Sequence, residues 1–144
     1  MILLDTTILV YATGADHPLR RPCRSLLELV RDDVVRATTT VEVIQEFAHV
    51  RGRRRPRSDA ARRAKEYALG LSPLVRPDED DLFEGLGLFE TSRDVGPFDA
   101  VLGAVATRRR WSLASADRSF GQIRSLNWLD PASSDFLLMA QQSP

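Results

Sequence analysis

The chain contains a single cysteine, Cys23, among its 144 residues. One thiol can form no disulfide within the chain, and it cannot build a thiolate cage around a metal ion. A lone cysteine is typical of a protein in a reducing compartment, where it is usually buried and unreactive. The sequence also lacks a His-Glu-x-x-His motif, a phosphate-binding Walker loop and a glycine-rich dinucleotide fingerprint. These absences exclude several large classes of metalloprotease, nucleotide hydrolase and dehydrogenase.

Long apolar runs are missing as well. The first four residues are apolar, but Asp5 interrupts them long before a signal-peptide core would be complete. No later stretch approaches the roughly 20 residues of a membrane span. We therefore expect a cytoplasmic protein without membrane contact. The length and the 43% hydrophobic content predict one compact domain over residues 1–144.

An excess of charge of either sign is also absent, since 20 basic and 20 acidic side chains balance. The distribution is uneven, however. A basic run comprises Arg51, Arg53, Arg54, Arg55 and Arg57, and an acidic cluster comprises Asp78, Glu79, Asp80 and Asp81. Such a basic run can hold a phosphate backbone locally, and it can equally be a solvated surface. Charge alone leaves both interpretations open.

Short apolar runs alternate with longer helical patterns, which predicts βαβ units around a parallel sheet. We expect strands at 2–4, 34–37, 112–114 and 126–129, and a short one at 74–75. Helices are expected over 6–12 and after Thr38–Thr40, and further helices should begin near Asp16, Ser58, Asp78 and Pro97. The predicted fold class is α/β, doubly wound, with a parallel sheet and helices on both of its faces.

Four carboxylates fall at positions that this fold can bring together. Asp5 and Asp117 follow predicted strands, and open parallel sheets bind ligands beyond the carboxyl ends of their strands. Asp99 lies in the first turn of a predicted helix, and Glu46 lies one turn after Glu42 on another. Clustered acids are costly without a compensating cation, and hard divalent ions prefer oxygen ligands. The pattern therefore favours metal-assisted hydrolysis of a phosphodiester.

Four segments resemble the motifs of the PIN-domain family, in the same order and at similar spacing. They are ILLDTTILVY (2–11), TVEVIQEF (40–47), GPFDAVLGAVA (96–106) and ASADRSF (114–120). The likeness covers nearly the whole chain. Within the family it is strongest to the VapC toxins of toxin–antitoxin systems.

This resemblance implies a fold, an activity and a set of partners. It implies an endoribonuclease toxin that uses Mg²⁺ or Mn²⁺, forms a homodimer and is neutralised by a VapB-type antitoxin. Position by position, it assigns metal binding and catalysis to Asp5, Glu46, Asp99 and Asp117, with hydroxyl support from Thr7 and Ser115. Glu42 shares a helix face with Glu46 and is either a supporting partner or a solvated residue. The arginines of the basic run would hold the RNA backbone.

Two other interpretations compete with the toxin. One is a PIN-like module that binds RNA or a protein without cutting, which would have no physical need to keep four mutually repelling carboxylates together. The other is a structure-specific DNA nuclease, against which the small size of the chain speaks. Trp111 and Trp128 flank the late strands and are interpreted as packing residues rather than base-stacking ones.

Overall fold

The computed structural model describes residues 1–143, and at its centre is a sheet of four parallel strands. The strands are β1 (Ile2–Leu4), β2 (Ala37–Thr38), β3 (Ser112–Ala114) and β4 (Asn127–Leu129), in the order β2-β1-β3-β4. The chain moves outward in one direction from β1 to β2 and in the other from β3 to β4. The order therefore reverses between β1 and β3, as in other doubly wound sheets, and the predicted fold class is confirmed.

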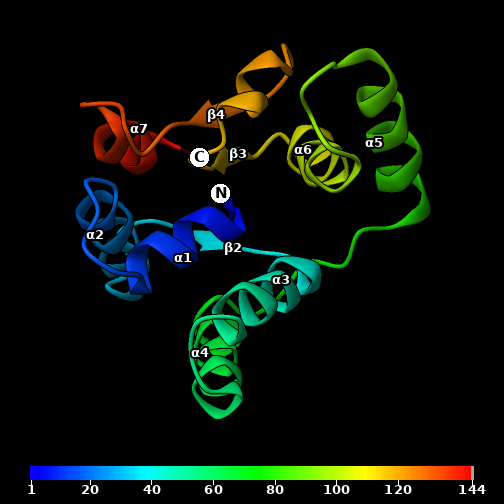
Figure 1. Ribbon diagram of the computed structural model, residues 1–144. Coiled ribbons are helices and arrows are strands. Elements are labelled where there is room, and N and C mark those ends of the chain that lie inside the picture. Colours follow the sequence, from blue (N-terminus) through cyan, green and yellow to red (C-terminus); the bar gives the residue numbers. More distant parts are fainter. Residues whose placement is uncertain (144) are drawn as a thin grey trace.

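Helices pack on both sides of this sheet (Figure 1). They are α1 (Thr6–Thr13), α2 (Arg20–Arg31), α3 (Val41–Gly52), α4 (Arg57–Gly70), α5 (Glu79–Thr91), α6 (Pro97–Arg109) and α7 (Phe136–Gln142), with a 3₁₀ turn at Arg118–Gln122. In Figure 1, α1, α2 and α7 lie on one side of the strands, α5 and α6 lie on the other, and the α3–α4 hairpin projects away from the sheet. Within residues 1–143, no helix is both long and apolar enough to cross a bilayer.

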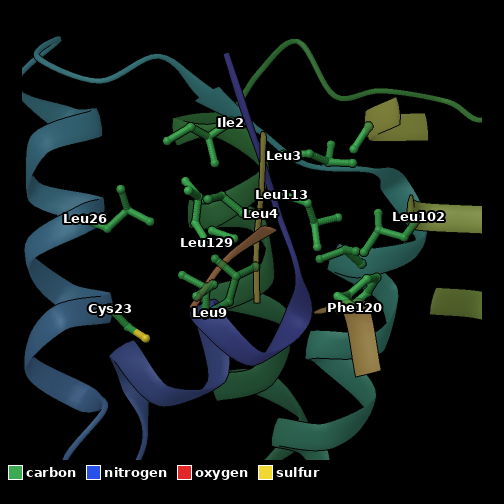
Figure 2. Packing of buried hydrophobic residues seen from close by; sticks show 14 of the residues in the cluster. Ile2, Leu3, Leu4, Leu9, Cys23, Leu26, Leu102, Leu113, Phe120 and Leu129 are labelled. Atoms are coloured by element: carbon green, nitrogen blue, oxygen red, sulfur yellow. The ribbon is translucent and has the colours of Figure 1, made fainter. Parts of the chain in front are cut away.

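The strands are short, and every side chain of the two central strands, β1 and β3, is buried. Ile2, Leu3 and Leu4 have no exposed surface, and neither does Leu113 beside them on β3. Cys23 and Leu26 point from α2 toward this layer (Figure 2). A strand that is buried on both faces reads as a continuous apolar run, which is why the sequence around residues 2–4 predicts it correctly.

Three expected element boundaries are wrong, and in place of the expected strand at 74–75 there is an isolated parallel bridge between Thr40 and Val75. Helix α2 begins at Arg20 rather than near Asp16. Pro18 disfavours a helical conformation at the residue before it, and the backbone amide of Leu19 donates a hydrogen bond to Nδ1 of His17. Pro56, rather than Ser58, occupies the N-cap of α4. The second strand starts at Ala37 rather than 34, because the amides of residues 34 and 35 still bond the end of α2.

Helices α5 and α6 pack closely through a glycine and a buried ion cluster. A Cβ placed on Gly85 would lie 2.6 Å from Cα of Val101, so only glycine fits at this contact. Asp81 is fully buried and accepts from Arg108 at 2.7 Å and from Arg109 at 2.8 and 2.9 Å. Asp81 also closes a capping box with Asp78 at the start of α5. The acidic cluster and the arginines at the end of α6 therefore join two helices.

Candidate active site

Asp5 lies at the carboxyl end of β1, where the strand order reverses, and caps helix α1. Its Oδ2 accepts three hydrogen bonds: 3.2 Å from the amide of Thr7, 2.6 Å from the Thr7 hydroxyl and 2.7 Å from the Ser115 hydroxyl. Among residues 1–143, no hydrogen bond reaches Oδ1. One oxygen of this buried carboxylate is thus fixed by the protein, and the other is available to a ligand.

Thr7 and Ser115 connect Asp5 to the end of β3. The Thr7 hydroxyl accepts from the amide of Ala116 at 2.9 Å, and the Ser115 hydroxyl accepts from the amide of Asp117 at 2.9 Å. The loop after β3 is thereby held against the start of α1. The predicted hydrogen bonds from both hydroxyls to Asp5 are present, and they extend to the backbone that carries Asp117.

Glu46 reaches the same region from α3. Thr40 caps this helix through the amide of Val43, as its sequence position predicts. The Glu46 carboxylate accepts a short hydrogen bond from the hydroxyl of Thr6, a residue whose role the sequence pattern does not predict. Thr6 stands directly before Thr7, and successive helical residues point in different directions. The adjacent threonines therefore fix two different acids.

The four predicted acids line a single hollow of about 280 Å³, here called the acidic pocket. Its lining residues are Asp5, Thr6, Thr7, Val10, Tyr11, Glu46, Val50, Asp99 and Asp117. Burial, together with repulsion from Asp5, Asp117 and Glu46, raises the pKa of the Asp99 carboxyl from 3.8 to about 6. The position of Asp99 in the first turn of α6 favours its anion but does not offset these effects.

The chemistry of this pocket fits a hard divalent cation. Every charged group on its wall is a carboxylate. A bound cation would stabilise the ionised form of Asp99 and so lower its raised pKa. In the part of the chain that the structure describes, no three Asp, Glu, His or Cys side chains form a ready-made ligand cage. Mg²⁺ does not require such a cage, because it usually keeps several waters and takes few ligands directly from protein.

Comparison with known proteins identifies the family of this chain. A model of the PIN domain matches residues 2–126. The chain belongs to the PIN-domain family. It is 50% identical over 125 residues to ribonuclease VapC7 of Mycobacterium tuberculosis, covering 85% of this chain and 86% of that protein. Ribonuclease VapC13 of the same species is 30% identical over 125 residues, covering 83% and 92%.

Solved structures show the same fold at much lower sequence identity. VapBC-1 of nontypeable Haemophilus influenzae has a chain that aligns with a TM-score of 0.71 at 18% identity, covering 92% of this chain and all of that one. VapBC2 of Rickettsia felis, bound to a DNA fragment from its promoter, gives 0.69 at 16%, covering 90% and 98%. This PIN domain therefore retains the architecture where little of the sequence is shared.

Glu42 does not line the acidic pocket of this PIN domain. It lines a separate apolar groove of about 540 Å³ between α3, α5 and α6, together with Leu82, Leu86 and Phe98. Its Oε2 is buried and has no hydrogen-bond partner among residues 1–143. The two glutamates of α3 therefore line different hollows. Glu46 lies in the acidic pocket with Asp5, Asp99 and Asp117, and Glu42 does not.

The predicted RNA-binding arginines divide between two hollows. Arg51, Arg54 and Arg55 line a hollow of about 180 Å³ that shares Val10 and Val50 with the acidic pocket. Of these three, Arg51 also forms an ion pair with Asp59 of α4. Arg53 and Arg57 instead line a different hollow between α3 and α4. Among the described residues of the basic run, Arg51, Arg54 and Arg55 therefore lie beside the acidic pocket, and Arg54 and Arg55 are the two that form no ion pair.

Proposed function

We propose that this chain is a VapC-type endoribonuclease toxin that hydrolyses RNA phosphodiester bonds with Mg²⁺ or Mn²⁺ held in the acidic pocket. The observation that carries the proposal is the convergence of Asp5, Glu46, Asp99 and Asp117 from four separate segments on one hollow. The VapC ribonucleases that share up to 50% of the sequence support the same activity.

The four acids and their hydrogen-bond partners have different roles in this proposal. Asp5, with Oδ2 held by Thr7 and Ser115, presents Oδ1 as a fixed ligand, and Glu46 is held by Thr6. Asp99 and Asp117 complete the anionic wall. When bound, the cation would activate water and offset the charge that develops on the scissile phosphate. Arg54 and Arg55 would hold RNA phosphates beside the pocket.

Protein partners are part of the proposal. We infer a VapB-type antitoxin, because the solved structures with this fold are of VapBC proteins. We also infer a homodimer, which the membership of the PIN-domain family implies. Large apolar side chains on and beside α5 support a protein interface, since soluble monomers rarely expose contiguous apolar patches. They are Leu82, Phe83, Leu86, Phe89 and Phe98, each at least 40% exposed.

The test of activity is cleavage of a cellular RNA pool by the purified chain, freed of any antitoxin. Discrete fragments should form with Mg²⁺ or Mn²⁺, vanish with EDTA, and vanish in Glu46→Gln. The control is Glu90→Gln, which makes the same change at an exposed site on α5. A calorimetric titration with Mn²⁺ supplies a readout apart from cleavage, and Asp99→Asn should weaken that binding.

Several outcomes would contradict the proposal. Cleavage that persists in EDTA would exclude the metal. Folded protein that binds RNA but never cuts it would favour the non-cleaving module instead. Equal loss of activity in Glu46→Gln and Glu90→Gln would remove the special role of the acidic pocket.

A further inference from the structure

A second basic hollow lies at the start of α2. It has a volume of about 420 Å³, and Arg20, Arg21 and Arg24 line it together with His17. Within residues 1–143 none of the three arginines forms an ion pair, and Nε of Arg20 is buried without a hydrogen-bond partner. An unpaired, partly desolvated guanidinium is a strong site for an anion.

The hollow is connected to the acidic pocket through an aromatic stack. The ring of Tyr11, which lines the acidic pocket, lies against the ring of His17 with centroids 4.5 Å apart. His17 in turn lines the hollow of the three arginines. A continuous surface therefore runs from the acids, over Tyr11 and His17, to Arg20, Arg21 and Arg24.

The spacing of the three arginines suits a phosphate backbone. Arg20 and Arg24 are one helical turn apart and so share a face of α2, with Arg21 on the adjacent face. Asp16 and Glu28 also line the hollow, yet neither forms an ion pair with an arginine there among the described residues, and the basic side chains outnumber them. The hollow thus presents guanidinium groups that are not used to hold the fold.

We propose that Arg20, Arg21 and Arg24 form a second RNA-phosphate site, so that a single strand bound in the acidic pocket also contacts two basic hollows. Arg54 and Arg55 hold it in the hollow that adjoins the pocket at Val10 and Val50, and the α2 arginines hold it in the hollow reached over Tyr11 and His17. Tyr11 and His17 offer a ring surface between the acids and α2, on which an unpaired base can stack. This inference rests on the proposed function, because it takes RNA as the ligand.

The test measures the affinity of the full chain for a fluorescent single-stranded RNA of mixed sequence, in EDTA, over a range of salt. Three lost phosphate contacts should make the slope of log K against log salt shallower by about 2, at roughly 0.7 per contact for single strands. The variant is Arg20→Ala, Arg21→Ala and Arg24→Ala together. Alanine is the best helix former, so α2 should remain folded, and circular dichroism checks this.

The matched control removes the same charge elsewhere. The control changes three exposed arginines together: Arg31→Ala, Arg36→Ala and Arg124→Ala. Arg36 and Arg124 precede β2 and β4, and so lie near the amino ends of the strands, whereas Asp5 and Asp117 follow the carboxyl ends. This control should keep the wild-type slope. Equal slopes in the wild type and the α2 variant, or an equal change in the control, would overturn the second site.

The same variants separate this inference from the proposed function. With Mg²⁺ present, the α2 variant should raise KM for a long RNA and leave kcat nearly unchanged, because the acidic pocket is intact. A wild-type chain that binds RNA with the expected slopes but never cleaves it would refute the nuclease and keep the binding site. A chain that cleaves RNA without any effect of the α2 variant on KM or slope would do the reverse.

Discussion

Asp81 offers a quantitative test of the ion cluster that joins α5 to α6. Burial acts to raise the pKa of this carboxyl. Hydrogen bonds from Arg109, the amide of Asp78 and Arg108 outweigh that effect and lower the pKa from 3.8 to about 2. A group whose pKa is lower in the folded chain than in the unfolded one stabilises the fold above the unfolded value. That stabilisation is lost as the pH falls toward the folded value.

The magnitude follows from the shift. A change from 3.8 to about 2 corresponds to about 2 kcal/mol of unfolding free energy at pH 7, at 1.36 kcal/mol per pH unit. By pH 3 the contribution falls to about 1 kcal/mol, because the folded and unfolded forms then differ less in protonation. Asp81→Asn keeps the side chain's shape and an acceptor oxygen but removes the charge. We therefore expect it to cost about 2 kcal/mol at pH 7 and about half of that at pH 3.

The assay is urea denaturation followed by circular dichroism at pH 7, 5 and 3. Glu66→Gln is the control, because Glu66 also pairs with two arginines, Arg62 and Arg63, but on an exposed surface. Exposed pairs contribute little, so this variant should unfold close to the wild type. A destabilisation by Asp81→Asn that is the same at pH 7 and pH 3 would refute the electrostatic reasoning, and so would none at pH 7.

Three further outcomes follow from the packing. Gly85→Ala should destabilise the chain by about 1–3 kcal/mol, because the added Cβ would overlap α6. Gly87→Ala has open space around the added Cβ and should stabilise the chain slightly. Urea denaturation of the two variants measures the difference. Thr6→Val should reduce RNA cleavage by about 10- to 100-fold, because the hydrogen bond to Glu46 is lost. Thr6→Ser should restore most of the cleavage. Equal rates in the two variants would contradict the role of the Thr6 hydroxyl in holding Glu46. Cys23 is fully buried and its pKa is raised by burial to about 12, so a thiol reagent should label it only after unfolding, and rapid labelling of native protein would refute this.

The sequence predicts the sheet and the positions of the acids well because both depend on local patterns. Asp5 and Asp117 directly follow short apolar strands, and Asp99 follows a proline that can only begin a helix. Parallel topology then brings the strand ends to one edge. The periodicity of α3 and its threonine cap place the helix that carries Glu46, but the choice of Glu46 over Glu42 rests on the resemblance to the PIN-domain motif. No contact between distant residues had to be known for the other three acids.

What the sequence does not predict depends on side-chain direction over long separations. The bond from Thr6 to Glu46 joins α1 to α3, and nothing in the segment around Thr6 distinguishes it from Thr7. The separation of Glu42 from Glu46 depends on how α5 and α6 close the groove beside Thr40. The burial of Asp81 likewise requires both α5 and the end of α6, so the charge pattern of the acidic cluster does not predict it.

The pairing of charges explains how a chain of zero net charge can present basic sites to RNA. Much of its acidic charge neutralises arginines that hold helices together, as Asp59 does for Arg51 and Asp81 does for Arg108 and Arg109. Apart from Arg51, the arginines of the two hollows that adjoin the acidic pocket belong to no such pair in the described chain. They are Arg20, Arg21, Arg24, Arg54 and Arg55. Because potential near a surface depends on local and not total charge, these five side chains can attract a phosphate backbone toward the acids that repel it. A cation in the acidic pocket would remove that repulsion where the strand must approach most closely, so RNA affinity should rise with Mn²⁺ more in the wild type than in Asp99→Asn.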